Sequence, residues 1–183
     1  MKCLKIFALT SLISVCSMAI GFGVEGGFRQ QSGDVPTGLS SSSQVGYTLG
    51  AVGYLDISEK LAVRSGVMYT QRPLKIESDL TKDSTNVNLT YFDVPLALML
   101  KFEEWMGVYA GVALSVNLDK SSSNTNVVKL QDVKSMVVPF QFGVTFKFMP
   151  EMGLNLYFEQ FGDVADGLKS YRSVGANLLF TMD

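Results

Sequence analysis

The residues best suited to chemistry in this chain are charged or amide side chains that recur at alternate positions between apolar ones. They are Glu25, Arg64, Arg72, Asp93, Lys101, Gln141, Lys147 and Glu159. Side chains point alternately to the two faces of a β-strand, so this spacing places polar groups on one face and apolar groups on the other. An enclosed charge without a partner is costly. We therefore expect these residues to form a network of ion pairs and hydrogen bonds inside a closed β-structure.

Catalysis, by contrast, lacks its usual residues. The chain contains no histidine, which removes the commonest general base and the imidazole ligands of zinc sites. Both cysteines, Cys3 and Cys16, lie in a segment that we expect to be removed as a leader. Acidic residues in the expected loops do not follow the spacing of a calcium-binding loop. We expect no enzymatic activity, no metal site and no cofactor.

The stretch of residues 91–102 shows how such a two-faced strand is built. Its apolar positions run at every second residue from Phe92 to Phe102, and Asp93 lies on the opposite face. This length matches the roughly 9–11 residues with which a tilted strand crosses a bilayer. Pro95 has no amide hydrogen to donate to a neighbouring strand, so we expect a bulge or local kink there.

The same alternation recurs along the chain and predicts eight strands. They cover residues 21–29, 45–57, 61–72, 88–102, 107–118, 136–148, 153–161 and 171–181. Long polar segments at residues 30–44, 73–87, 119–133 and 162–170 alternate with short turns at 58–60, 103–106 and 149–152. Long loops at one end, short turns at the other and an even strand number are typical of outer-membrane barrels. We expect an all-β, eight-stranded antiparallel up-and-down transmembrane β-barrel.

Residues 1–19 have the pattern of a secretory signal peptide. Lys2 and Lys5 precede an apolar run over residues 6–15, and Ser17-Met18-Ala19 provides small residues at a cleavage position. We expect the barrel domain to occupy residues 20–183. After the leader, no apolar run approaches the ~20 residues of a membrane helix, so a membrane span requires a closed barrel.

The apolar faces are rich in aromatic residues and nearly free of charge, which suits lipid. We expect the following residues to face the membrane or its interfaces: Phe92, Leu98, Phe102, Trp105, Phe142, Phe148 and Phe180. Tyr171 is a further candidate for the interfacial aromatic girdles. The hydrophobic fraction of 47% beside 17% charged residues agrees with apolar surface that faces something other than water.

Alternation alone does not say which face is inside. In a secreted, lipocalin-like soluble barrel the apolar faces would enclose a pocket for an apolar ligand, and the polar faces would meet water. The polar faces of this chain carry few charges and much glycine, alanine, serine and threonine. A surface that faces water normally carries more lysine and glutamate. The membrane barrel is therefore the favoured prediction and the soluble barrel the alternative.

The motif Tyr91-Phe92-Asp93-Val94-Pro95-Leu96, with Leu98 to Lys101 after it, resembles the outer-membrane β-barrel domain family related to PorT. The whole pattern is similar to OmpX and to the membrane domain of OmpA. The resemblance implies a small barrel in the outer membrane of a Gram-negative-type bacterium. Such barrels often end in an aromatic residue, whereas Phe180 is followed by three more residues. The enzymes among similar barrels use histidine, which this chain lacks.

An eight-stranded barrel encloses a bore that side chains fill, so we expect a plugged lumen. The predicted role is structural or surface interaction, with outer-membrane lipid as one partner and a protein or surface partner at the polar loops. The formal net charge of −2 argues against nucleic acid. The alternative is a minor channel or an accessory of a transport or secretion assembly.

Overall fold

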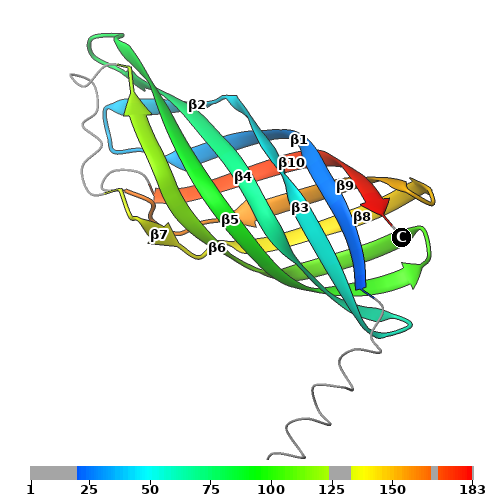
Figure 1. The fold of residues 1–183 in the computed structure, drawn as a ribbon. Coiled ribbons are helices and arrows are strands. Elements are labelled where there is room, and N and C mark those ends of the chain that lie inside the picture. Colours follow the sequence, from blue (N-terminus) through cyan, green and yellow to red (C-terminus); the bar gives the residue numbers. More distant parts are fainter. Residues whose placement is uncertain (1–19, 124–132, 166–168, 183) are drawn as a thin grey trace, which may run out of the picture.

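The computed structural model describes residues 20–123, 133–165 and 169–182, which form an all-β structure (Figure 1). The predicted signal peptide, residues 1–19, lies outside the described residues, as does most of the third long loop, residues 124–132. Within these three described ranges, no helix is long and apolar enough to cross a membrane.

Ten strands make up a single sheet. The long strands are β1 (Ile20–Asp34), β3 (Val45–Ser58), β4 (Leu61–Ser78), β5 (Ser84–Glu103), β6 (Met106–Ser122), β8 (Phe140–Met149), β9 (Met152–Gln160) and β10 (Lys169–Met182). Two short strands, β2 (Leu39–Ser43) and β7 (Met136–Val137), lie in the connections and pair with β4 and β6. All of these pairings are antiparallel.

The eight long strands close into a ring. Each pairs with the next long strand along the chain, and β1 pairs with β10 to complete the circle. A closed ring leaves no unpaired edge along these strands. In lipid this is necessary, because no water is present to hydrogen-bond with free backbone amide and carbonyl groups. The predicted eight-stranded antiparallel up-and-down barrel is therefore confirmed.

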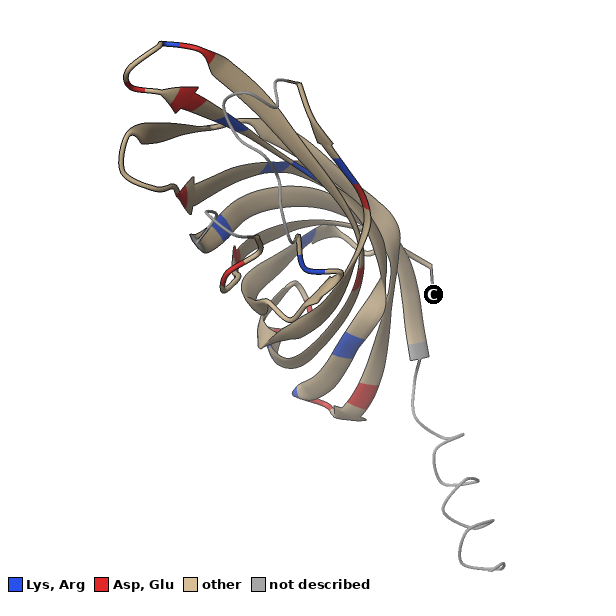
Figure 2. Cartoon of the chain, turned by 90° about the vertical axis from the view of Figure 1, so that its left-hand side faces the viewer, with Lys and Arg blue, Asp and Glu red and all other residues tan. Residues whose placement is uncertain are grey.

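The two ends of the barrel differ as the loop lengths predict. Turns at residues 59–60, 104–105 and 150–151 lie at one end, which also holds Ile20 and Met182 and which we call the turn end. The longer connections lie at the other end, which we call the loop end. Figure 2 shows charged residues concentrated at both ends, with a smaller number on the strands between them.

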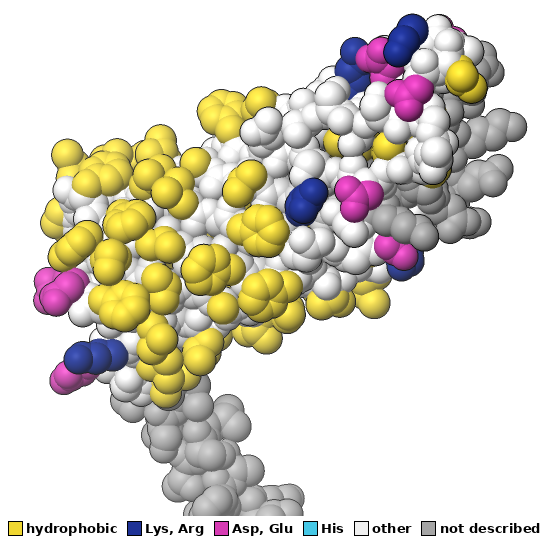
Figure 3. Space-filling view, turned by 180° about the vertical axis from the view of Figure 1, so that it is seen from behind, with side chains coloured by type: hydrophobic (Ala, Val, Ile, Leu, Met, Phe, Trp, Pro, Cys, Tyr) yellow, Lys and Arg dark blue, Asp and Glu magenta, His cyan; other side chains and the backbone are white. Residues whose placement is uncertain are grey.

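The outer surface near the turn end is an apolar belt. Its exposed members include Phe22, Val24, Phe28, Leu49, Val67, Leu96, Leu98, Leu100, Val112, Phe142, Leu156, Val174 and Leu178. Aromatic side chains flank the belt, among them the stacked pair Tyr47 and Tyr69 towards the loop end. Apolar side chains gather over one half of the face in Figure 3, and the other half is mostly polar. An apolar outside of this extent is a surface for lipid.

The polarity of β4 and β5 reverses beyond Arg72. Leu74 and Ile76 on β4 point inward and are buried, while Lys75 between them lies on the outer face. On β5, Val87 and Leu89 are buried in the same way. β2, residues 72–90 and residues 161–165 thus make an outer extension with an apolar inside and a polar outside. This arrangement suits water, whereas the belt below it suits lipid.

Several predicted boundaries are wrong for this reason. The segment 73–87, predicted as a polar loop, is mostly strand, and only residues 79–83 join β4 to β5. The predicted loop 30–44 contains the end of β1 and all of β2. Tyr171 was expected in an interfacial girdle but is fully buried. It packs in the apolar core of the outer extension, where its aromatic ring is buried away from water.

Pro95 and Pro139 each affect strand pairing because proline has no amide hydrogen to donate. A bulge, one of the two alternatives expected at Pro95, is not observed there, because the register of β5 against β6 runs through this residue and shifts instead between Thr90 and Tyr91 and between Lys101 and Glu103. Against β4, the ladder omits the pairs opposite Val94 and Pro95. Pro139 interrupts the strand predicted over residues 136–148, so β8 begins only at Phe140.

An arginine in the middle of the apolar belt should destabilise the folded barrel. We expect Leu98→Arg, and likewise Phe142→Arg, to cost about 2–4 kcal/mol, because the charge must then face lipid. Reversible denaturant unfolding in lipid vesicles measures this loss. The matched control is Leu80→Arg at the tip of the β4–β5 connection, where Leu80 is 90% exposed and the change should stay within about 0.5 kcal/mol. If Leu98→Arg and Phe142→Arg cost no more stability than Leu80→Arg, the lipid-facing and inward faces of the strands are assigned backwards.

Candidate functional site

The centre of the lumen is occupied by charged side chains. Among the residues that the structure describes, six charged side chains are buried. They are the arginines Arg29, Arg64 and Arg72 and the carboxylates Glu25, Asp93 and Glu159. Strands β1, β4, β5 and β9 place them at inward positions of their alternation. Positive and negative groups are equal in number, so the network as a whole is neutral.

One half of this network is centred on Glu25. An Arg64 Nη atom lies 2.7 Å from the Glu25 carboxylate. Asn155 and Asn177 donate side-chain hydrogen bonds to the same carboxylate over 3.2 and 3.3 Å. The Tyr109 hydroxyl in turn donates to Asn155 over 3.0 Å. Four strands thus meet at one carboxylate and a fifth joins through Asn155, which ties opposite walls of the barrel together.

The other half links Arg72, Asp93, Glu159 and Arg29. Arg72 holds Asp93 with two hydrogen bonds, of 2.7 and 3.3 Å, and also reaches Glu159 at 3.3 Å. Arg29 pairs with Glu159 from the other side and donates to Ser173. The Ser173 hydroxyl donates to Glu159 over 3.1 Å. Glu159 therefore serves two arginines at once.

Aromatic rings complete the surroundings of the guanidinium groups. Arg64 lies 4.6 Å from the centre of the Tyr109 ring, and Arg72 lies 4.7 and 4.6 Å from the centres of Tyr91 and Phe161. A ring face attracts a cation and shields it from the apolar wall. Arginine suits this position because its planar fork can pair with carboxylates while its face stacks on a ring.

Little space remains inside the network. The cavity among these side chains measures about 20 Å³, which is room for about one water molecule. Its lining includes Glu25, Arg29, Arg64 and Gln141. A hydrated ion needs a wider path than this cavity provides.

A buried apolar core lies at the loop end. Residues 161–165, from the connection between β9 and β10, fold back into the mouth and bury Phe161, Val164 and Ala165. These pack against Leu74, Ile76, Val87, Leu89, Tyr91 and Tyr171 in one apolar core. Phe161 meets Tyr171 edge to face with 5.6 Å between ring centres. The loop end of the barrel therefore has a packed apolar interior where β4, β5 and residues 161–165 meet.

The predicted lumen residues divide into two groups. Glu25, Arg64, Arg72, Asp93 and Glu159 lie in the central network, and Gln141 is buried beside it. Lys101 and Lys147 lie apart from it and line a second cavity at the turn end, where Lys101 is 2.5 Å from Asp56. The inward phase of both lysines agrees with the alternation, but their positions near the turns place them away from the centre.

The sequence analysis missed Arg29, Asn155 and Asn177. Arg29 shares the parity of Glu25 on the first strand, and this parity was a usable signal. The two asparagines also occupy inward positions, but an uncharged side chain in the sequence does not indicate that it will hydrogen-bond to a buried carboxylate. Their importance follows only from the register, which pairs Asn155 with Asn177 next to Glu25.

The residues predicted to face lipid are all exposed, and Trp105 among them lies in a short turn at the rim of the turn-end cavity. They are Phe92, Leu98, Phe102, Trp105, Phe142, Phe148 and Phe180. Trp105 stacks on Phe146 with 6.5 Å between ring centres. Over the described part of the chain, no group of three or more histidine, cysteine, aspartate or glutamate residues is placed to hold a metal ion.

Comparison with known proteins identifies the kind of barrel. The sequence profile of the outer membrane protein beta-barrel domain family matches residues 17–169. No curated protein sequence matches the chain. At the level of structure, OprG from Pseudomonas aeruginosa matches with a TM-score of 0.55 and 13% identity, over 90% of this chain and 97% of OprG.

Two further solved structures share the fold. Ail of Yersinia pestis, in complex with the heparin analogue sucrose octasulfate, gives a TM-score of 0.53 at 13% identity, over 88% of this chain and 99% of Ail. Neisserial surface protein A gives 0.52 at 18% identity, over 90% of this chain and 98% of its own. At such identities the likeness extends to the fold alone.

Removing one partner of a buried pair should cost far more than removing one partner of an exposed pair. We expect Glu25→Gln to destabilise the barrel by about 3–5 kcal/mol, because Arg64 is left charged without its carboxylate. The matched control is Glu77→Gln, whose ion pair with Lys75 is exposed and should be worth about 0–1 kcal/mol. Denaturant unfolding in lipid vesicles gives both values.

The double variant Glu25→Gln with Arg64→Met provides a second check. It removes both charges, so part of the lost stability should return relative to Glu25→Gln alone. Strictly additive losses would contradict a coupled network.

Proposed function

Because the chain belongs to the outer membrane protein beta-barrel domain family, we propose that it is a closed barrel that anchors a folded, water-facing extension at the cell surface. It is an outer-membrane β-barrel protein of a Gram-negative-type bacterium. The proposed role is structural or surface interaction rather than catalysis. The leader at residues 1–19 would direct export.

The orientation follows from the connections. In outer-membrane barrels the short turns face the periplasm and the longer loops face outward. The turn end of this chain therefore faces the periplasm, and the outer extension lies outside the cell. This places the connections at residues 79–83 and 161–165 on the external side.

The observation that carries the proposal is the reversed polarity of β4 and β5 beyond Arg72. A barrel that served only as a membrane plug would need no apolar core above the belt. Here Leu74, Ile76, Val87 and Leu89 are buried in such a core. The outer extension is consequently held in one shape by packing and by strand pairing with β2. A fixed shape favours specific contact with a partner, because less conformational freedom is lost on binding.

The outer extension offers such a partner a hydroxyl-rich surface of mixed charge with more acidic than basic side chains, namely Glu77, Asp79, Asp83 and Asp163 against Lys75 and Lys82. Ser40, Ser42, Ser43 and Ser84 are exposed on it, and Lys75 lies 3.6 Å from Glu77. Because the charges of this surface are mixed, we do not propose that it binds a polyanion such as the heparin analogue that was crystallised with Ail. A protein or an uncharged hydrated surface suits this chemistry better.

Transport through the lumen is the weaker candidate. The central network leaves about 20 Å³, and the apolar core with residues 161–165 fills the mouth above it. An ion path would have to cross both. We therefore place the functional surface on the outside of the extension rather than in the bore.

Surface display can be tested with introduced cysteines, because Cys3 and Cys16 both lie in the predicted leader. Leu80→Cys, at the tip of the outer extension, should react with a membrane-impermeant maleimide on intact cells. Glu59→Cys, in a short turn, should react only after the outer membrane is permeabilised. The chain without an introduced cysteine is the control for background labelling. Labelling of Glu59→Cys but not of Leu80→Cys on intact cells would reverse the orientation and refute the proposal.

A further inference from the structure

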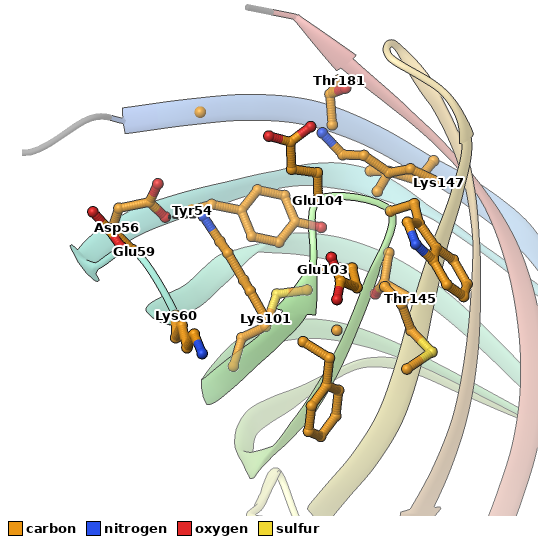
Figure 4. A pocket seen from close by; sticks show the side chains of 17 residues that line it. Tyr54, Asp56, Glu59, Lys60, Lys101, Glu103, Glu104, Thr145, Lys147 and Thr181 are labelled. Atoms are coloured by element: carbon orange, nitrogen blue, oxygen red, sulfur yellow. Dashed lines mark hydrogen bonds and ion pairs between the residues drawn. The ribbon is translucent and has the colours of Figure 1, made fainter.

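A second cavity opens at the turn end, below the central network. Its volume is about 640 Å³, within the range of roughly 300–1,000 Å³ that small-molecule pockets occupy. Figure 4 shows the lining side chains on the strands and turns around this opening, and in the orientation proposed above it faces the periplasm rather than lipid. Met99 and Leu179 give it buried apolar walls, and the Tyr54 and Trp105 side chains border it.

One wall of the cavity carries polar groups without partners. Thr145 and Lys147 lie two residues apart on the inward face of β8. Thr145 is 3% exposed, and its hydroxyl has no hydrogen-bond partner among the described residues. The Lys147 ammonium likewise makes no ion pair with any described carboxylate within the 20–123, 133–165 and 169–182 ranges. A buried hydroxyl left without a partner normally has one supplied from elsewhere.

The remaining charges around the cavity are accounted for differently. Lys101 and Asp56 neutralise each other at 2.5 Å. Glu59, Lys60, Glu103 and Glu104 stand on the exposed turns at the rim, where water screens them. Figure 4 shows Glu104 and Lys147 above the same opening. The half-buried Lys147 is thus the charge that a ligand inside the cavity would meet.

We propose that this cavity is a periplasmic binding site for a small carboxylate with an apolar body. Lys147 and Thr145 donate to the carboxylate, while Met99, Leu179 and the Tyr54 ring surround the apolar part. An ammonium and a hydroxyl on one wall make a donor pair that a carboxylate satisfies. The site does not depend on what the outer extension binds.

Trp105 provides a direct readout, because it is the only tryptophan in the chain and borders the cavity. The probe is para-iodobenzoate, whose iodine quenches tryptophan fluorescence at short range. The full mature protein is reconstituted in nanodiscs and titrated with this probe. Para-iodobenzylamine and para-iodobenzyl alcohol serve as charge-reversed and neutral probes of similar shape. We expect saturable quenching by the carboxylate alone.

Variants locate the site. Lys147→Met keeps the length of the side chain without its charge and should weaken the saturable component about tenfold. Thr145→Val keeps the shape without the hydroxyl and should weaken it about threefold. Lys120→Met is the matched control. It removes an exposed lysine near the loop end of β6, far from the cavity at the turn end, and should leave binding unchanged.

Filling the cavity gives an independent check. A Cβ atom on Gly21 would meet only the Tyr54 Cβ, at 4.0 Å, so Gly21→Leu has room to occupy the space. It should abolish saturable quenching while the protein still shows the heat-dependent gel shift of a folded barrel. Quenching that rises without saturation and equally for all three probes would reduce the effect to partition into lipid and overturn the proposal. Preference for the amine would overturn it in favour of the acidic rim.

Discussion

The six charged side chains buried at the centre of this barrel have to be paired with one another, and that constraint organises the middle of the lumen. Lipid surrounds the belt, so water cannot stabilise Arg29, Arg64 or Arg72 from the outside. Three carboxylates neutralise the three arginines, and asparagine, serine and aromatic side chains complete the surroundings. The pairs join residues that lie far apart in the sequence, such as Glu25 with Asn155 and Arg29 with Glu159. The network therefore fixes how the strands face each other across the bore, in addition to the backbone ladders that fix each strand to its neighbours.

The second constraint is the change of solvent along a single strand. Around the belt the outside is lipid, so apolar side chains point out and polar ones point in. Beyond Arg72 the outside is water, and Leu74 and Ile76 turn the same inward positions into an apolar core. The backbone alternation continues without interruption, and only the chemistry of the two faces is exchanged. This change separates an anchoring part from a part shaped for the cell surface.

Strand alternation and the order of long and short connections sufficed to predict the barrel, its strand number and its outward face. Glu25, Arg64, Arg72, Asp93 and Glu159 were found because charge at inward positions is conspicuous. The outer extension was missed because lysine, serine and asparagine between Pro73 and Val87 resemble a loop, although Leu74, Ile76 and Val87 continue the alternation. Which residues pair across the bore depends on register and ring closure, and no local pattern contains that information. The separation of Lys101 and Lys147 from the central network, by contrast, follows from their positions beside the predicted short turns and could have been read from the sequence.

Ion conductance across a planar bilayer reports directly on whether side chains close the lumen. Purified protein that shows the heat-dependent gel shift of a folded barrel would be inserted into the bilayer. The current would be recorded at both polarities, with an open porin as the positive control. A lumen filled by the arginine and carboxylate network and by the core around Phe161 predicts no steady conductance above the bare bilayer. Reproducible conductance steps of uniform size would contradict this account and would identify the bore as a channel.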